Sequence, residues 1–215
     1  MATEDTQSRA VPAPSHIRQA RRTQLVEVTL ELVAEHGYAA TSLARIARAA
    51  GITKGAVLYH FPTKDAVLAA AREQVLAELV ADVGAAVDAC GATAAPGAYV
   101  RRMVGHLAED PRRARVLVQA GLHEAGLHED SPRRGGAPDG GARPASAARW
   151  QALAALLRRA RPSGGPGPAL DPRTLAIAVG GAIDGIVAEM LEDPSYDAVA
   201  AAETVVRMLE GELSR

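Results

Sequence analysis

Apolar residues recur every three or four positions along most of the chain, which is the spacing of one face of an α-helix. In residues 17–36, Leu25, Thr29 and Leu32 share a face while glutamates occupy another, and longer apolar stripes follow in residues 64–90 and 172–192. No stretch of useful length alternates apolar and polar residues as a half-buried strand does. The pattern predicts an all-α protein of about nine helices.

Capping residues predict the limits of the first four helices. Gly37 suits the end of the first helix, and Thr41 or Ser42 can cap a second that runs to residue 50. Thr53 caps a third helix that ends near residue 61, and Thr63 caps a long fourth one. The later helices are expected at residues 99–108, 111–127, 146–161, 172–192 and 195–212, with Gly- and Pro-rich connectors at 130–145 and 161–171.

Residues 42–61 have the spacing of a helix-turn-helix. Ala47 is small enough for two helices to cross there, Gly51 suits a turn with positive φ, and Val57 can bury against the first helix. Such a triple arises by chance in alanine-rich chains, but the predicted caps agree with it. We therefore expect a helix-turn-helix in this segment.

Composition limits the class of protein. The chain has 215 residues, enough for one large domain or a small and a medium one, and its aromatic content of 3% predicts an aliphatic core. A single cysteine, Cys90, excludes an intramolecular disulfide framework and a cysteine-based zinc site. No signal peptide and no apolar run of bilayer length is apparent, so we expect a soluble, cytoplasmic protein.

Basic residues gather in the N-terminal part. Residues 16–65 hold seven basic and four acidic residues, and the chain's two lysines, Lys54 and Lys64, both lie there. The remainder is acidic on balance. This asymmetry favours a polyanionic partner for the N-terminal part, although a solvated surface is the simpler alternative.

Several short runs resemble the TetR/AcrR family of bacterial transcriptional regulators. They are Gly37-Tyr38-Ala39-Ala40-Thr41-Ser42, Ile46-Ala47, Ala50-Gly51-Ile52-Thr53-Lys54-Gly55 and Tyr59-His60-Phe61-Pro62-Thr63-Lys64-Asp65. The resemblance is specific over about residues 17–70. Residues 1–15, with Pro12, Pro14 and several small polar residues, are expected to form a disordered tail. The resemblance implies a DNA-binding domain at 16–63 and a helical domain at 64–215 that binds a small molecule and dimerises through the last two helices.

The resemblance also implies the DNA contacts, which come from the second and third helices and the start of the fourth: Thr41, Ser42, Thr53, Lys54, Gly55, Tyr59, His60 and Lys64. Arg45 and Arg48 are candidates for further contacts, and Phe61 is expected in the core. Leu58 departs from the family pattern, since many members have tyrosine there. The alternatives are that the hydroxyl residues only cap helices, that Tyr59 is a core ring and that the lysines are plain surface charges.

An effector pocket in the body would be mainly aliphatic, with a few polar anchors. Its candidate residues are Met103, His106, Leu107, Leu117, His123, Trp150, Leu153, Ile177 and Asp184. Ordinary core or surface positions are the alternative for each of them. Three glycines, Gly180, Gly181 and Gly185, predict that another helix or a ligand approaches the helix at 172–192 closely.

These patterns predict a homodimeric repressor that binds a palindromic operator and is released by an apolar effector. No nucleophile–base pair, metal-ligand set or phosphate loop is apparent, so we expect no enzyme, no metal and no cofactor. The alternative is a helical small-molecule-binding or partner-binding protein that does not read DNA. For the two closing helices, the alternative to dimerisation is that their apolar stripes are intramolecular core.

Overall fold

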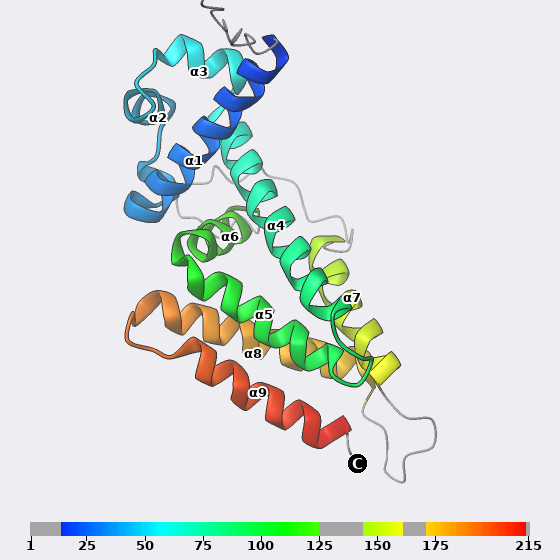
Figure 1. The fold of residues 1–215 in the computed structure, drawn as a ribbon. Helices are drawn as coiled ribbons and strands as arrows, with labels where there is room; N and C mark the ends of the chain where they lie inside the picture. The colour runs from blue at the N-terminus through cyan, green and yellow to red at the C-terminus, as the bar shows by residue number, and fades with distance from the viewer. Residues whose placement is uncertain (1–13, 125–143, 161–170, 214–215) are drawn as a thin grey trace, which may run out of the picture. The chain divides into compact units, whose positions relative to one another are not determined.

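The computed structural model describes residues 14–124, 144–160 and 171–213, and these residues form nine helices and no strand (Figure 1). The all-α class is therefore confirmed. The predicted N-terminal tail and the two connectors lie almost wholly outside the described residues. The helices are α1 (Pro14–Ala40), α2 (Leu43–Ala49), α3 (Lys54–His60), α4 (Lys64–Asp88), α5 (Ala95–Glu109), α6 (Pro111–Glu124), α7 (Pro144–Ala160), α8 (Pro172–Glu192) and α9 (Ala198–Leu213).

The chain divides into two compact units, Met1–Ala71 and Arg72–Arg215. The division falls inside α4, whereas the sequence places the domain boundary at the start of this helix. The first two turns of α4 belong to the first unit because Val67, Leu68 and Ala71 are buried in it.

In the first unit, α2, α3 and α4 begin where the sequence predicts, whereas α1 starts at Pro14, before the predicted residue 17, and runs to Ala40 rather than 36. The Ser42 hydroxyl accepts a hydrogen bond from the backbone N–H of Arg45 at 3.2 Å and caps α2. Thr53 caps α3 in the same way. Gly37 has φ 79° and interrupts α1 near its end, and Gly51 has φ 67° in the turn between α2 and α3. Gly51 thus adopts the positive φ that was predicted for it, and Gly37 also has a positive φ near the end of α1.

The core of the first unit gathers side chains that are distant in the sequence. Leu25, Ile46 and Val57 are fully buried, and Phe61 is 2% exposed. Phe61 is thus a core residue, as predicted. The Thr29 hydroxyl is buried on α1 and donates to the carbonyl of Leu25 at 2.7 Å, so a polar residue on the apolar face satisfies its own hydrogen bond.

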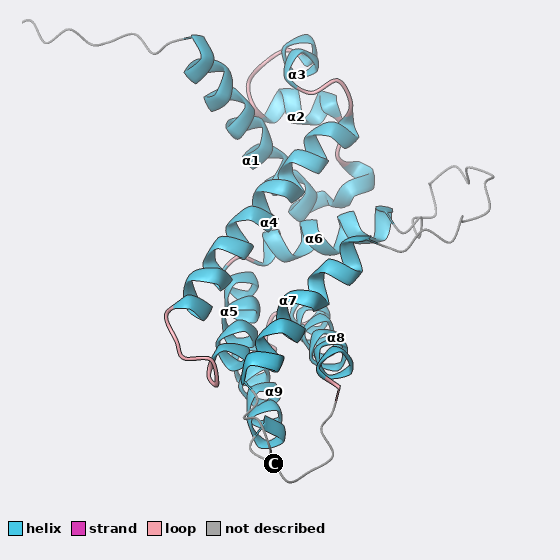
Figure 2. Cartoon of the chain, turned by 90° about the vertical axis from the view of Figure 1, so that its right-hand side faces the viewer, coloured by secondary structure: helices cyan, strands magenta, loops and turns pink. Residues whose placement is uncertain are grey.

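In the second unit, α8 lies beside α5, α7 and α9 (Figures 1 and 2). Its apolar stripe, with Val179, Ile183 and Ile186, is buried against these helices. Helix α5 packs closely on α9. A Cβ at Gly97 would lie 3.2 Å from Cγ1 of Val206, so this contact fixes a glycine in the first turn of α5, which begins at Ala95 rather than at the predicted Tyr99.

Helix α8 is long and apolar enough to cross a membrane when only its length and mean hydropathy of 1.6 are considered. Polar residues such as Asp184 interrupt the stretch, so it is not a continuous apolar run of bilayer length. The core helix of a soluble protein passes the same test, and the buried stripe of α8 packs on its neighbours.

Gly180 provides the close approach that the glycines of α8 predict. A Cβ at this position would lie 1.6 Å from Cζ3 of Trp150, so the indole of α7 occupies the space that a side chain would need. Gly181 and Gly185, in contrast, have no atom within 4 Å of such a Cβ. Within the part of the chain that the structure describes, only Gly180 of the three glycines is therefore required by the packing.

We expect Gly180→Ala to lower the melting temperature. Overpacking against the indole costs about 1–3 kcal/mol, and the better helix propensity of alanine offsets at most about 1 kcal/mol of this. Gly84→Ala in α4 is the matched control, since its Cβ would meet nothing within 4 Å, and it should raise the melting temperature. Equal stability of the two variants, measured by thermal unfolding, would contradict the assigned contact.

Candidate nucleic-acid interface

Helices α2 and α3 pack on each other across a tight turn. Ala47 is 4% exposed at their crossing, and Val57 of α3 is fully buried. The backbone N–H of Ile52 donates to the carbonyl of Ala47 at 2.9 Å and closes the turn at Gly51. The predicted helix-turn-helix is thus present in the geometry of these residues.

The N-terminal end of α3 presents small and basic side chains to solvent. Lys54 and Gly55 are both exposed. A Cβ at Gly55 would meet only the Thr53 hydroxyl oxygen, at 3.9 Å, so the fold itself has room for alanine there. Because glycine in a helix costs about 1 kcal/mol relative to alanine, this glycine calls for a reason outside the fold, such as close approach by a partner.

The far end of α3 carries an aromatic pair. Tyr59 is 69% exposed, so the alternative of a buried core ring is wrong. His60 lies edge-on to the Tyr59 ring with 5.1 Å between centroids. Burial lowers the pKa of His60, and the guanidinium groups of Arg18, Arg22 and Arg21 lower it further. The imidazole is therefore neutral at neutral pH.

The two hydroxyls at the start of α2 differ in accessibility. Ser42 is exposed and, beyond its capping bond, can reach a partner. Thr41 is 1% exposed, and its hydroxyl donates to the carbonyl of Gly37 at 2.9 Å. A side-chain contact of Thr41 with DNA has no support in this geometry. Of the two other candidates on α2, Arg48 is exposed and Arg45 half-buried.

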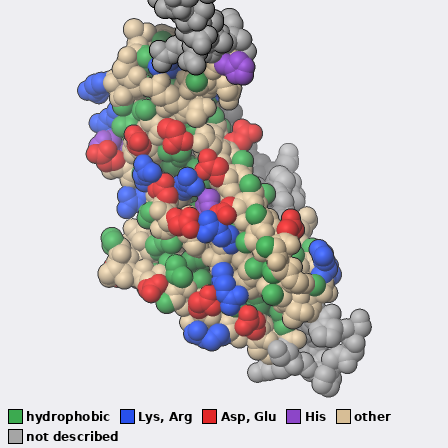
Figure 3. Space-filling model, in the orientation of Figure 1, with side chains coloured by type: hydrophobic (Ala, Val, Ile, Leu, Met, Phe, Trp, Pro, Cys, Tyr) green, Lys and Arg blue, Asp and Glu red, His purple; other side chains and the backbone are tan. Residues whose placement is uncertain are grey.

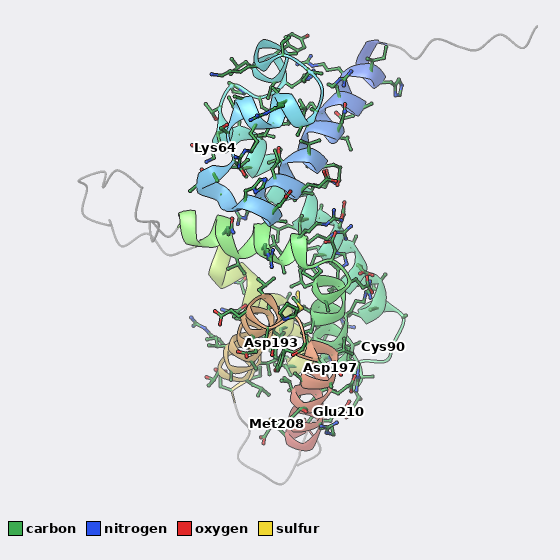
Figure 4. The ribbon with its side chains drawn as sticks, turned by 90° about the vertical axis from the view of Figure 1, so that its left-hand side faces the viewer. Lys64, Cys90, Asp193, Asp197, Met208 and Glu210 are labelled. Carbon is green, nitrogen blue, oxygen red and sulfur yellow. The ribbon has the colours of Figure 1, made fainter. Side chains whose placement is uncertain are left out.

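Lys64 makes contacts within the first unit that the amino-acid sequence did not predict (Figure 4). Its ammonium group donates to the carbonyl of Tyr38 at 2.6 Å and lies 4.1 Å from the centre of the Tyr38 ring. The Tyr38 hydroxyl in turn donates to Asp65. Burial lowers the pKa of Lys64, partly offset by the carboxylate of Asp65. Lys64 thus joins the end of α1 to the start of α4.

Replacing Lys64 and Lys54 separately should therefore give different results. Lys64→Ala removes a charged hydrogen bond to a backbone carbonyl, so we expect it to lower the free energy of unfolding by about 1–3 kcal/mol. Lys54→Ala changes an exposed side chain and should leave the free energy of unfolding within about 0.5 kcal/mol of the wild type. Urea unfolding measures both, and equal values would contradict a structural role for Lys64.

In the second unit, a polar cluster joins α4, α5 and α6. The Nδ1 atom of His106 lies 2.6 Å from Oδ2 of Asp82, and its Nε2 atom lies 3.2 Å from a guanidinium nitrogen of Arg113. Arg102 also donates to Asp82 at 2.6 Å. Hydrogen bonds from Arg102 and then His106 hold the pKa of Asp82 below its ordinary value. Figure 3 shows acidic and basic side chains interleaved on this face.

The cluster assigns the proton on His106. Because a guanidinium can only donate, Nε2 must accept the hydrogen bond from Arg113 and Nδ1 must carry the proton that Asp82 accepts. His106 is 5% exposed, so both of its ring nitrogens are used within the protein. The His106 side chain is therefore less available to bind an effector than was predicted from the sequence.

Most of the candidate effector residues belong to one hydrophobic cluster. Leu107 and Leu153 are buried in it, and Met103, Leu117 and Trp150 are partly buried against it. Ile177 is 46% exposed and Asp184 is also exposed, so these two do not face the interior that holds Leu153. The side chain of His123 lies outside the described residues. The effector site stays a prediction.

In α8 and α9, the apolar residues predicted to form the dimer interface and the residues exposed to solvent lie on different faces. Val179, Ile183, Ile186 and Met190 of the stripe are buried within the chain, and so are Val206 and Leu209 of α9. For these residues, the alternative of intramolecular core is correct. A different face of the same helices is exposed and, beside the exposed Asp184, carries small and apolar residues (Met208 is labelled in Figure 4): Ile177, Ala178, Gly181, Gly185, Val199, Ala200 and Met208.

The geometry described so far defines a helical protein with an N-terminal helix-turn-helix unit. Residues 25–71 match the family model described as "Bacterial regulatory proteins, tetR family". The matched segment is similar to this family, as the sequence motifs predicted. The matched residues include all of α2 and α3, together with α1 from Leu25 onward and the first turns of α4 up to Ala71.

Individual relatives agree with this assignment. The chain is 33% identical over 106 residues to the HTH-type transcriptional regulator BetI of Burkholderia thailandensis; this covers 49% of the chain and 53% of that regulator. The chain thus spans about half the length of this relative. The fold is similar to the fatty acid degradation regulator FadR from Bacillus halodurans, with a TM-score of 0.70, 22% identity and coverage of 93% of this chain and 96% of that one.

A second solved structure has the same fold. It is a TetR-like transcriptional regulator from Rhodococcus sp. RHA1, with a TM-score of 0.70, 18% identity and coverage of 95% of this chain and 99% of that one. Both structural likenesses extend over nearly the whole chain, including the helices after α4. The fold of the second unit is therefore also that of such regulators.

Proposed function

We propose that the chain is a cytoplasmic, ligand-responsive transcriptional regulator that binds DNA as a homodimer. The observation that carries the proposal is the end of α3. Lys54 and Gly55 are exposed at its N-terminus, and the glycine is one that the fold does not require. A recognition helix enters the major groove with its N-terminal residues toward the base edges, where a missing side chain permits close approach.

The contacts assigned to DNA fall into two groups. Lys54 and Gly55 meet base edges or the phosphates beside them, while Ser42, Thr53, Tyr59 and His60 contact phosphates around the groove. Lys64 contributes in a different way, because its ammonium group fixes the start of α4 against α1. A weaker operator complex of a Lys64 variant would therefore combine a lost charge with a less stable first unit.

The second unit would hold the effector and act through α4. An apolar compound that binds among α5–α8 with different affinity in two conformations shifts the equilibrium between them. The Asp82–His106–Arg113 cluster connects α4 to α5 and α6, so rearranged packing in the body would act on the helix that continues into the first unit. Release of DNA by such an effector would make the chain a repressor.

Selection from random duplex DNA tests the proposal directly. We expect the wild-type protein to enrich an inverted repeat at physiological salt, since a symmetric dimer reads two half-sites about 34 Å apart. Lys54→Ala should weaken binding to that repeat roughly tenfold and reduce the slope of log affinity against log salt by about one. Arg158→Ala on α7, which is exposed in the other unit, is the matched control and should bind like the wild type.

Other outcomes separate the alternatives. A folded protein that enriches no sequence and is not retained on duplex DNA at low salt would favour a helical small-molecule-binding or partner-binding protein. Enrichment of a single, non-repeated site would retain the DNA-binding function and contradict the dimer. Loss of binding by the Arg158→Ala control would show that net charge rather than α3 carries the affinity.

The exposed small-residue face of α8 and α9 is the proposed dimer interface. Gly181 lies at its centre with open space around it, so Gly181→Glu leaves the fold of the chain intact and places a charge in the interface. We expect the dimer dissociation constant to rise roughly hundredfold, because an unpaired charge would be buried. Ala81→Glu on the exposed side of α4 is the control. Light scattering measures both, and a dimeric Gly181→Glu variant would place the interface elsewhere.

A further inference from the structure

We infer that the N-terminal turns of α1 form a second contact with the DNA backbone, made by Arg18 and Arg21 beside the end of α3. The inference rests on the proposed DNA-binding function and extends it to a helix that the motif does not include. Three features of the first unit support it: the arrangement of the arginines on α1, their contacts with α3, and the charges around them.

The first feature is a stripe of arginines on one side of α1. Arg18, Arg21 and Arg22 are three and four residues apart, so they share a face of the helix. This face continues the side of α1 that buries Leu25 in the core. The N-terminal turns of the helix therefore extend beyond the packed core. On this face they carry guanidinium groups, and the buried apolar residues begin one turn later.

The second feature is contact with the C-terminal end of α3. Arg22 lies over the Phe61 ring, 4.2 Å from its centre, and donates to the carbonyl of His60 at 2.6 Å. Arg18 lies 5.5 Å from the centre of the exposed Tyr59 ring. Arg22 thus fixes α1 against α3, and this places Arg18 next to two residues already assigned to DNA phosphates.

The third feature is the charge of this region. From Ser15 to Val26 the sequence contains three arginines and no carboxylate. The charges that act on His60 are those of Arg18, Arg22 and Arg21. Arg21 is half-buried and its guanidinium donates to Gln24, a neutral side chain, at 2.6 Å. The guanidinium charges of Arg18 and Arg21 thus stay available to an anion.

The partner that fits this surface is the phosphate backbone of duplex DNA. Tyr59 and His60 belong to the helix that enters the groove, so a backbone that passes the end of α3 meets Arg18 next. Guanidinium groups bind phosphate oxygens in pairs of parallel hydrogen bonds. An acidic protein would also be attracted to two arginines. The following experiment distinguishes this alternative partner from DNA.

The test compares three full-length proteins on the selected operator. Arg18→Ala together with Arg21→Ala removes the proposed contact and leaves Arg22, which holds α1 on α3. Arg158→Ala together with Arg159→Ala removes two exposed arginines from α7 in the other unit and serves as the matched control. Thermal unfolding verifies that each variant is as stable as the wild type, and Arg18→Lys with Arg21→Lys tests whether charge alone restores binding.

We expect the α1 variant to bind roughly ten- to thirtyfold more weakly at physiological salt, with a slope of log affinity against log salt smaller by about two. The loss should be the same on operator and on unrelated duplex, because phosphate contacts carry no sequence information. Replacing single phosphates with uncharged methylphosphonates should weaken binding of the wild type at the phosphates that α1 contacts. The same replacements should leave the affinity of the α1 variant unchanged. The control should match the wild type throughout.

Distinct results would overturn the inference or the function beneath it. If the α1 variant binds as tightly as the wild type while Lys54→Ala does not, DNA binding stands and the α1 contact is wrong. If every methylphosphonate replacement weakens the α1 variant as much as it weakens the wild type, a local contact between α1 and particular phosphates is also contradicted. If the wild-type protein binds no duplex at all, both the function and the inference fail.

Discussion

Each of the two units depends on its own section of α4, a single helix that contributes to both. Its first two turns are buried in the first unit, and Lys64 fixes its start to the end of α1 through a charged hydrogen bond. Further along, Asp82 fixes it to α5 through His106 and Arg102. Hydrogen bonds to charged groups are stronger than neutral ones. Both sections of α4 are therefore held by directional contacts in addition to apolar packing.

The small residues of the chain have different functions that the structure separates. Gly37 and Gly51 allow a backbone turn with positive φ, whereas Gly97 and Gly180 make room for side chains of other helices. Gly55 meets neither condition. A residue that costs helix stability without a benefit in the fold is most simply explained by a partner, and in this chain it lies at the exposed end of α3.

Much of the first unit could be predicted because its determinants are local. Caps at Ser42 and Thr53, and the positive φ of Gly51, depend on residues within one helical turn. The close fit of Gly97 against Val206 could not be predicted in this way, because Val206 lies more than one hundred residues later in the sequence. The contact of Arg18 with the exposed Tyr59 ring likewise joins residues that are distant in the sequence.

The helical class, the helix-turn-helix and the residues that share each helical face could all be predicted, because capping and periodicity are properties of neighbouring residues. What covers each face depends on the packing of distant helices. This packing placed the apolar stripe of α8 in the core and left Gly181 open, and it gave Lys64 a backbone partner 26 residues away. It also placed Arg18 beside Tyr59. Periodicity states which side chains point the same way, but the identity of their partners depends on how distant helices pack.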